Sequence, residues 1–405
     1  MFFLAKIERC HLSNRNIGLD ELTELFIKNT PLIDVRAPVE FVQGSLPGSV
    51  NIPILGDEER AVVGTTYKYQ GSEAAVRLGY EMISGFVKQN LLQQWLDFIH
   101  QHPQAVLYCF RGGKRSQIAQ QWLKEAGVDR PLITGGFKMA RHFLINAIDR
   151  FSANRKLLVV TGPTGSGKTR LIQDISDTYP ALDIEAIARH RGSAFGGLPA
   201  SQPAQIDFEN RLAVNLLKLE HGIQFEPVVV EDESRHIGSV YLPASFFTCM
   251  RNSEIIWIDE SFETRINNIF ADYILNTAIG KAQQNCLRQQ KRTALSGNQG
   301  ILHDQALRLF EKYQHALQMI NKKLGGQRFQ EVSQDLENAR LDFLRMNEIQ
   351  SNKIWIEKLV KYYYDPLYLG SLQRRQVNPC FKGSRGEVID YLQFRKQKEL
   401  NFYKA

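Results

Sequence analysis

The sequence is poor in cysteine, and its cysteines never stand in the pairs that bind metals. Five of them lie at positions 10, 109, 249, 286 and 380 of 405 residues, without a C-x-x-C motif. No zinc site or disulfide framework is therefore predicted, and a reducing compartment fits best.

Long apolar runs are missing as well. No stretch approaches the roughly 20 apolar residues that span a bilayer, and the run after Met1 is too short for a secretory signal. The sequence also lacks internal repeats and low-complexity tracts. We therefore expect a cytoplasmic protein with no membrane partner.

The composition is that of a globular protein, with 43% hydrophobic and 23% charged residues. Its length suits two domains, each with its own core. Basic residues outnumber acidic ones, which gives a net charge of +7 and a pI near 9.0. This excess predicts a polyanionic partner, with nucleic acid as the first candidate and a merely basic enzyme as the alternative.

Short apolar runs alternate with helical spacing in the first 150 residues. Runs at 31–35, 105–108 and 131–133 predict buried parallel strands, and residues 91–99, 116–126 and 138–151 have the spacing of helices. This alternation is typical of an α/β domain. We expect that domain over residues 1–150.

The rest of the chain begins with the same alternation. Runs at 157–160, 227–230 and 254–258 predict three strands of a second α/β core over residues 151–262. Helical spacing dominates residues 263–323 and 336–364, and we expect Asp365-Pro366 to break the helix. Residues 263–405 are thus predicted as a helical subdomain with a basic tail, which could pack with that core.

A lone thiol follows the strand run 105–108, in the loop Cys109-Phe-Arg-Gly-Gly-Lys-Arg-Ser116. Cations and inward-turned N–H groups would stabilise a thiolate and hold an oxyanion beside it. Cys109 is therefore the predicted catalytic residue. The predicted anion loop consists of Arg111, Gly112, Gly113, Lys114, Arg115 and Ser116.

The spacing of this loop leaves its chemistry open. Cys109 and Arg115 form a C-x5-R pattern, which matches cysteine-dependent phosphatases and is one residue longer than the usual sulfurtransferase loop. A longer ring of N–H groups fits a larger, tetrahedral anion. A phosphatase and a sulfurtransferase both remain in contention, and an inert buried cysteine is the third reading.

A complete P-loop follows the strand run 157–160 and opens a helix. Its glycines permit the turns, its N–H groups receive phosphate oxygens, and its lysine adds a point charge. The predicted diphosphate-binding residues are Gly162, Gly165, Ser166, Gly167, Lys168 and Thr169. Glu231 or Asp232, after the next strand, could hold Mg²⁺ with Thr169, or belong to a solvated edge. The identity of any metal stays unknown.

Three further groups of residues carry weaker signals. Residues 188–199 are rich in glycine and cations, so they are read as a lid that brings Arg189 and Arg191 to phosphate and Phe195 to an apolar moiety. Arg235 could reach a diphosphate. For the lid and for Arg235, the alternative is an ordered surface segment without a role in binding. The basic tail offers Arg374, Arg375, Lys382 and Arg385 to RNA, with a solvated tail as the alternative.

Residues 32–53 carry the order D-x-R, E-F, G, P-G, N-x-P, which resembles the entry motif of the rhodanese family. With the Cys109 loop and Gly135-Gly136, the resemblance covers roughly residues 15–150. It implies a parallel-sheet α/β domain whose thiolate carries a sulfur-family atom. Asp34 and Arg36 are then expected to brace the loop.

The two halves together resemble the bacterial tRNA 2-selenouridine synthase family. Three further motifs carry this resemblance, at residues 188–196, 231–238 and 363–368. The family implies replacement of sulfur by selenium in wobble 2-thiouridine of tRNAs for Lys, Glu and Gln. S-geranylation by geranyl diphosphate comes first, and selenophosphate then supplies selenium.

The resemblance also implies roles for the two sites. The P-loop would hold the diphosphate of geranyl diphosphate and need not hydrolyse a nucleotide. Cys109 would accept selenium as a Cys-S-Se⁻ adduct while Arg111 and Arg115 bind phosphate. No tightly bound cofactor is expected, Mg²⁺ remains an option, and the oligomeric state is left open.

Two other readings compete with this one. The first is a nucleotide-hydrolysing protein with a C-x5-R phosphatase or persulfide sulfurtransferase domain. The second is an RNA-binding module whose P-loop senses anions.

Overall fold

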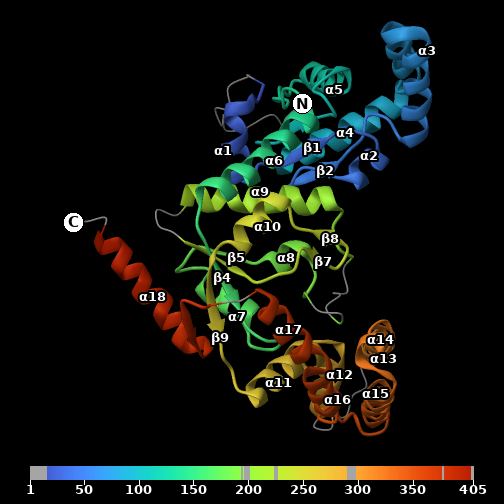
Figure 1. Ribbon diagram of the computed structural model, residues 1–405. Helices are drawn as coiled ribbons and strands as arrows, with labels where there is room; N and C mark the ends of the chain where they lie inside the picture. The colour runs from blue at the N-terminus through green and yellow to red at the C-terminus, as the bar shows by residue number, and fades with distance from the viewer. Residues whose placement is uncertain are drawn as a thin grey trace. The chain divides into compact units, whose positions relative to one another are not determined.

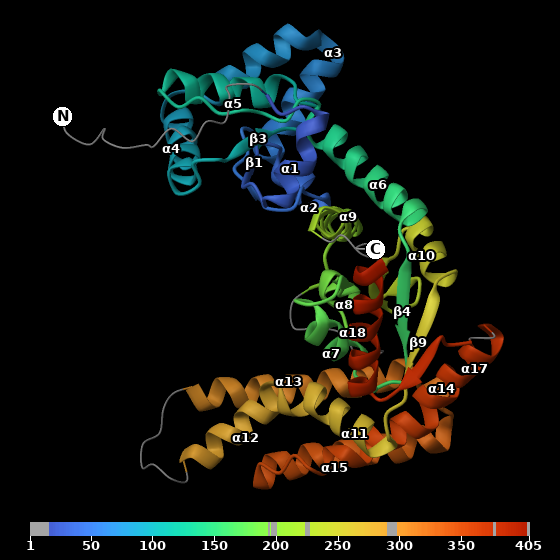
Figure 2. The same ribbon diagram turned by 90° about the vertical axis from the view of Figure 1, so that its left-hand side faces the viewer.

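The computed structural model describes residues 16–192, 195, 201–222, 227–289, 298–375 and 378–402, with side chains except at 285–289, 298–299, 371–374 and 399–402. The chain forms two compact units (Figures 1 and 2). Unit 1 comprises Met1–Asn154, Pro203–Gln224 and Val240–Phe246, and unit 2 comprises Arg155–Gln202, Phe225–Ser239 and Phe247–Ala405. Within 151–262, which we expected to form one core, residues 151–154, 203–224 and 240–246 belong to unit 1. None of the described helices is long and apolar enough to cross a membrane.

A three-stranded parallel sheet lies at the centre of unit 1, in the order β2-β1-β3. These strands are β1 (Leu32–Asp34), β2 (Ser49–Asn51) and β3 (Val106–Tyr108). β1 and β3 fall within predicted runs and are wholly buried. The run at 131–133 forms only isolated parallel bridges, one of which joins Leu132 to Leu107.

Helices build the rest of unit 1. They are α1 (Leu22–Ile27), α2 (Pro38–Gln43), α3 (Asp57–Met82), α4 (Gly85–Gln101), α5 (Lys114–Glu125), α6 (Gly136–Asn154) and α9 (Gln205–Gly222). α4 and α5 bring Trp95 and Trp122 to a core around Ile33 and Leu107. α3 is the longest of these helices, and Ala75 is its single buried residue.

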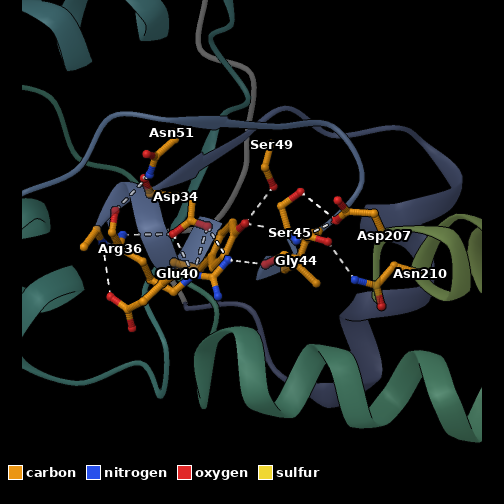
Figure 3. Close-up of polar contacts among 12 residues, drawn as sticks. Asp34, Arg36, Glu40, Gly44, Ser45, Ser49, Asn51, Asp207 and Asn210 are labelled. Carbon is orange, nitrogen blue, oxygen red and sulfur yellow. Dashed lines mark hydrogen bonds and ion pairs between the residues drawn. The ribbon is translucent and has the colours of Figure 1, made fainter. Parts of the chain in front are cut away.

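Polar contacts hold α9 to unit 1 (Figure 3). The Asp207 carboxylate accepts hydrogen bonds from the Ser45 N–H at 2.7 Å and the Ser45 hydroxyl at 3.1 Å, and the Asn210 amide donates to the Ser45 carbonyl at 2.6 Å. Arg141 of α6 donates to Asn210 at 2.8 Å and forms an ion pair with Glu209. These contacts explain why a segment between two strands of unit 2 belongs to unit 1.

Unit 2 contains five parallel strands in the order β10-β9-β4-β6-β5. The three predicted strands are present as β4 (Leu157–Thr161), β6 (Val228–Glu231) and β9 (Glu254–Ile258). The edges are β5 (Ala181–Leu182) and β10 (Phe381–Gly383). Because every pair is parallel, the carboxyl ends of β4, β6 and β9 meet at one edge of the sheet.

The predicted helical subdomain is present within unit 2, where α12, α13 and α15 run side by side (Figure 2). Its described elements are α11 (Phe262–Phe270), the π-helical turn η2 (Ala271–Leu275), α12 (Ala278–Gln289), α13 (Asn298–Met319), α14 (Asn321–Leu324), α15 (Gly326–Met346), α16 (Asn352–Leu359), the π-helical turn η3 (Val360–Tyr364) and α17 (Asp365–Arg375). Phe310, Phe343 and Trp355 lie in its buried core.

The predicted break at Asp365-Pro366 is wrong. The helix continues through Pro366 as α17, directly after η3. Proline disrupts a helix because it lacks an N–H and its ring crowds the preceding turn. The wider π turn before it changes the local hydrogen-bond pattern, so proline enters at the second position of α17 without ending the helix.

The basic tail folds onto the sheet of unit 2. β10 pairs with β9, and α18 (Arg385–Phe402) follows it. Val388 and Leu392 of α18 are buried against Leu171 and Ile172 of α7 (Lys168–Ile175). Two aromatic residues of this tail pack on each other, since Phe381 stacks on Tyr391 with ring centroids 4.3 Å apart.

Arg36 and Asp34 form an ion pair at the end of β1 that is 2% and 0% exposed (Figure 3). We expect Arg36→Leu to lower the free energy of unfolding of unit 1 by about 3–5 kcal/mol, because it strands a buried carboxylate. The double variant Asp34→Ala/Arg36→Leu should recover part of that loss. Denaturant titration followed by hydrogen exchange of the β1 and β3 amides measures both. Equal losses in the two variants would contradict the explanation.

Candidate functional site

The Cys109 loop joins β3 to the N-terminus of α5, as the sequence predicts. The Cys109 Sγ lies 3.1 Å from the Ser116 Oγ, and the Ser116 hydroxyl donates to the Gly113 carbonyl at 3.1 Å. Both Cys109 and Ser116 are buried. The sulfur thus lies beside the N-terminus of α5 and the Ser116 hydroxyl.

The glycine pair Gly135-Gly136 and the residues that follow it pack against this loop. The Phe137 and Lys138 N–H groups donate to the Cys109 and Phe110 carbonyls at 2.8 and 3.0 Å. A Cβ at Gly136 would lie 2.3 Å from the Cys109 oxygen, and one at Gly112, where φ is 64°, would lie 2.7 Å from the Gly135 nitrogen. Only glycine permits this approach.

The cations of the loop differ in how they are held. Arg115 pairs with Glu40 of α2 at 2.5 Å. Burial opposes ionisation of Glu40, yet its hydrogen bond with Arg115 holds the pKa of that carboxyl below its ordinary value. Arg111 and Lys114 make no ion pair within the described residues, so they remain available to an anion.

Asp34 and Arg36 brace the segment opposite this loop. Arg36 donates to the Gly44 carbonyl at 2.8 Å, and its guanidinium lies 4.0 Å from the centre of the Phe137 ring. Both side chains are buried, which suits a structural role. They therefore position the ring beside the glycine pair.

The predicted P-loop connects β4 to α7 and lies at the edge where the strands end. Gly165 and Gly167 have φ of 84° and 87°. The Lys168 ammonium donates to the Gly162 carbonyl at 2.8 Å, and the Ser166 hydroxyl is buried without a protein partner in the described part of the chain. N–H groups, an ammonium and a hydroxyl are thus ready for phosphate oxygens.

Helix α11 fixes the P-loop from the helical subdomain. Asn268 donates to the Gly165 carbonyl at 2.8 Å, and Arg265 donates to the Thr164 carbonyl at 2.9 Å. Arg265 also pairs with Asp365 of α17 at 2.5 Å. The subdomain therefore sets the shape of the phosphate cradle, which the local motif alone does not reveal.

Three carboxylates gather at Thr169, with ligand atoms within 4.8 Å of one another in Glu185, Glu231 and Glu233. The Thr169 hydroxyl donates to Glu185 at 2.9 Å and lies 3.2 Å from a Glu231 oxygen. Burial and the neighbouring Glu185 raise the pKa of Glu233 to about 8, and the same causes raise the pKa of Glu231 well above its ordinary value. Carboxylate and hydroxyl oxygens grouped this closely fit a hard cation such as Mg²⁺.

Asp232 has hydrogen-bond partners outside the carboxylate cluster. It accepts hydrogen bonds from Thr161 at 2.7 Å, Arg251 at 3.0 Å and Arg375 at 2.8 Å. The Tyr368 hydroxyl lies 2.7 Å from the Thr161 hydroxyl. Of the two acids considered from the sequence, Glu231 thus joins the carboxylate cluster, whereas Asp232 orients two arginines.

Several of these groups line one cavity of about 720 Å³. Lys168, Arg191, Arg251 and Arg375 line it together with carboxylates of the cluster. The Arg191 side chain donates to the Asp272 carbonyl at 2.7 Å. Arg189 and Arg235 are exposed and do not line the cavity, so of the predicted lid and support cations only Arg191 reaches it.

The remaining predicted residues lie elsewhere. Phe195 packs on Trp355 and Tyr313, within the helical subdomain, at ring-centroid distances of 5.9 and 6.1 Å. Lys382 pairs with Asp259 at 3.1 Å, and Arg385 lies 3.5 Å from Asp174. The Arg374 side chain, Cys10 and the Cys286 side chain fall outside the described residues.

Sequence reasoning missed Glu185, Arg251 and Tyr368. None of them stands next to the P-loop motif, and each is brought to the cavity by the fold. A signal existed only for Tyr368, which ends the motif at 363–368.

The fold and the two sites define an enzyme that combines a cysteine anion loop with a P-loop. Residues 19–139 match the rhodanese-like domain, and residues 155–399 match the tRNA 2-selenouridine synthase AAA domain. The chain therefore belongs to the tRNA 2-selenouridine synthase family, which confirms the predicted resemblance, and it is an enzyme of the transferase type.

Curated relatives named tRNA 2-selenouridine synthase agree along nearly the whole chain. The protein from Nitrosomonas europaea is 72% identical over 95% of this chain and 100% of its own length. That from Bdellovibrio bacteriovorus is 54% identical over 94% of this chain and 99% of its own. That from Pseudomonas fluorescens Pf-5 is 40% identical over 93% and 98%.

The raised pKa of Glu233 predicts how stability depends on pH. A carboxyl with a raised folded-state pKa contributes stability below its ordinary pKa, near 4.5, which is lost as pH rises to about 8. Without divalent cations, unit 2 should therefore lose up to about 1.4 kcal/mol per pH unit for one such group. Glu233→Gln should flatten this dependence in thermal melts, and Mg²⁺ should stabilise the wild type more at pH 8 than at pH 5.

The control is Glu263→Gln, which alters an exposed carboxylate of α11. It should keep the wild-type slope. An unchanged slope in Glu233→Gln would show that this carboxyl is not the titrating group.

Proposed function

We propose that this enzyme converts wobble 2-thiouridine of tRNA to 2-selenouridine through an S-geranyl intermediate, as the family resemblance implies. The observation that supports the proposal is the presence of two separate glycine-rich loops, of which one carries the Cys109 thiol, near cations without an ion pair in the described part of the chain, and the other is a P-loop. The tRNAs would be those for Lys, Glu and Gln, and the reaction would take place in the cytoplasm. Neither step requires a tightly bound cofactor.

The P-loop cavity suits the first step. The thiocarbonyl sulfur attacks the first carbon of geranyl diphosphate, a C–S bond forms, the C–O bond breaks, and diphosphate leaves. Lys168, Arg251 and Arg375 would stabilise the charge that develops on the leaving diphosphate. Thr169 and the carboxylate cluster would hold Mg²⁺, which supplies further charge neutralisation when bound. Nucleotide hydrolysis is not needed.

The Cys109 loop suits activation of selenophosphate. Attack on selenium would give the Cys-S-Se⁻ adduct implied by the family, but phosphorus would have to leave with two electrons as phosphite. Attack on phosphorus forms an S–P bond, breaks the P–Se bond and releases hydrogen selenide without any redox change. The C-x5-R spacing and the Ser116 hydroxyl beside the sulfur favour attack on phosphorus.

The second step then balances with water as its one further reactant. Hydrogen selenide adds to C2 of the S-geranyl nucleoside, and geranylthiolate leaves because alkylation made it a good leaving group. Water hydrolyses the S-phosphocysteine and returns the thiolate and phosphate. Arg111 and Arg115 would bind the phosphoryl group throughout.

Binding of tRNA needs exposed cations that can exchange partners. Lys382 and Arg385 fit, because surface ion pairs with Asp259 and Asp174 are weak and open readily. Arg374 remains a candidate from the sequence. Arg375 is better suited to the P-loop cavity, where Asp232 orients it.

Purified enzyme should be incubated with 2-thiouridine tRNA and geranyl diphosphate, and then with selenophosphate. Mass spectrometry of the nucleosides should show S-geranyl-2-thiouridine after the first addition and 2-selenouridine after the second. Absence of both products would refute the proposed function. Rapid nucleotide hydrolysis without RNA would favour the nucleotide-hydrolysing alternative.

Lys168→Ala should reduce geranylation by about a hundredfold or more, because it removes a cation aimed at the diphosphate. Lys156→Ala is the matched control, since this exposed lysine precedes the opposite end of β4. The rate of geranylated product formation measures both variants. A similar loss in each would contradict the assigned role.

Cys109→Ala should spare geranylation and stop selenation, while Cys380→Ala, which changes an exposed cysteine, should affect neither. Loss of geranylation alone in Cys109→Ala would reverse the assignment of steps to sites. Rapid quenching of the wild type with selenophosphate identifies the adduct, because a phosphoryl group lacks the isotope pattern of selenium. A selenium pattern on Cys109 would refute attack on phosphorus.

A further inference from the structure

A cavity of about 860 Å³ lies over Cys109 within unit 1. One wall is the Cys109 loop with α5, and the other is α3. A selenophosphate ion has only five heavy atoms and would fill a small part of this space. The donor alone therefore does not explain the size of the cavity.

The inner wall of the cavity is largely apolar. Ile54, Val63, Val76, Ile118 and Trp122 line it. An inorganic trianion gains no binding free energy from such a surface, since apolar side chains offer it no hydrogen bonds. A hydrocarbon group does gain, because burial removes its surface from water.

The charged residues that line the cavity are all basic: Arg60, Lys68, Arg111, Lys114 and Arg115. Arg60 and Arg115 contact Glu40. Lys68, Arg111 and Lys114 have no acidic partner among the described residues. With the exposed rings of Tyr67 and Tyr80, they form a rim that complements a phosphate backbone and unstacked bases.

Helix α3 has few buried side chains, so the face that it turns to the cavity is accessible. Gly71, with φ of 86°, interrupts its helical backbone, and Ala75 is the single buried residue over Asp57–Met82. The side chains of a long segment thus remain free to meet a ligand, with apolar and aromatic residues turned to the cavity.

We propose that this cavity binds the S-alkylated nucleoside of the RNA substrate, with its hydrocarbon chain against the apolar wall and the flanking phosphates on the basic rim. The inference rests on the proposed function, because the hydrocarbon is the geranyl group of the intermediate. Hydrogen selenide that is released at Cys109 then lies close to C2 of the nucleoside, the carbon that it attacks.

The test compares selenation of purified tRNA carrying S-geranyl-2-thiouridine with selenation of tRNA carrying S-methyl-2-thiouridine. Val76→Gln, on the apolar wall, should raise KM for the geranyl substrate about tenfold, and by less than twofold for the methyl substrate. Val62→Gln is the matched control on α3, where Val62 is 47% exposed and does not line the cavity. It should leave both KM values within twofold of wild type.

A second pair of variants tests the rim. Tyr67→Ala should raise KM for both substrates alike, by about tenfold, because a ring on which a base stacks is lost. Tyr69→Ala, which removes a ring that is 74% exposed and outside the cavity, should change neither. Thermal melts check that each variant is folded.

The outcomes separate this inference from the proposed function. Equal effects of Val76→Gln on the two substrates, or no effect on either, would overturn the hydrocarbon site. Equal effects of Tyr67→Ala and Tyr69→Ala would refute the proposed binding of RNA at the rim. Failure of wild-type enzyme to convert S-geranyl tRNA with selenophosphate would instead refute the proposed function.

Discussion

A main chain can turn its N–H groups toward an anion only where no Cβ stands in the way, and both sites of this enzyme depend on that constraint. Gly112 and Gly136 approach so closely that a methyl group on either would collide with backbone atoms. Gly165 presses against α11 in the same way, with the Arg265 carbonyl 2.6 Å from where its Cβ would lie. The thiol, the cations and the hydroxyls take their positions from these glycine contacts.

Charge at the P-loop is distributed unevenly, and this unevenness has a function. Asp232 is compensated by Arg251 and Arg375, so it costs little to bury and orients both guanidinium groups. Glu231 and Glu233 are buried close to other carboxylates, and Lys168 offsets this only in part at Glu233. Burying uncompensated charge destabilises a fold, and a bound cation offsets that cost. A cation bound at this cluster would therefore stabilise unit 2.

Local patterns in the sequence predicted the features that depend on neighbouring residues. β1, β3, β4, β6 and β9 follow from apolar runs, and the Cys109 loop and the P-loop follow from contiguous motifs. Glu185 and Arg251 could not be found in this way, because α8 (Ile184–Ala188) and α10 (Ala244–Arg251) bring them to the cavity from separate parts of the chain. α3 escaped prediction because its exposed face lacks the apolar stripe of a core helix. The break expected at Pro366 was wrong because a π turn precedes it.

Residues 205–222 have a consequence for how the molecule forms. They are encoded after the P-loop, yet they complete unit 1 through Ser45 and Arg141. A ribosome must therefore finish two strands of the second sheet before the first unit has all its parts. The chain is interlaced, since a fragment ending at Asn154 would leave α6 without its partner helix α9.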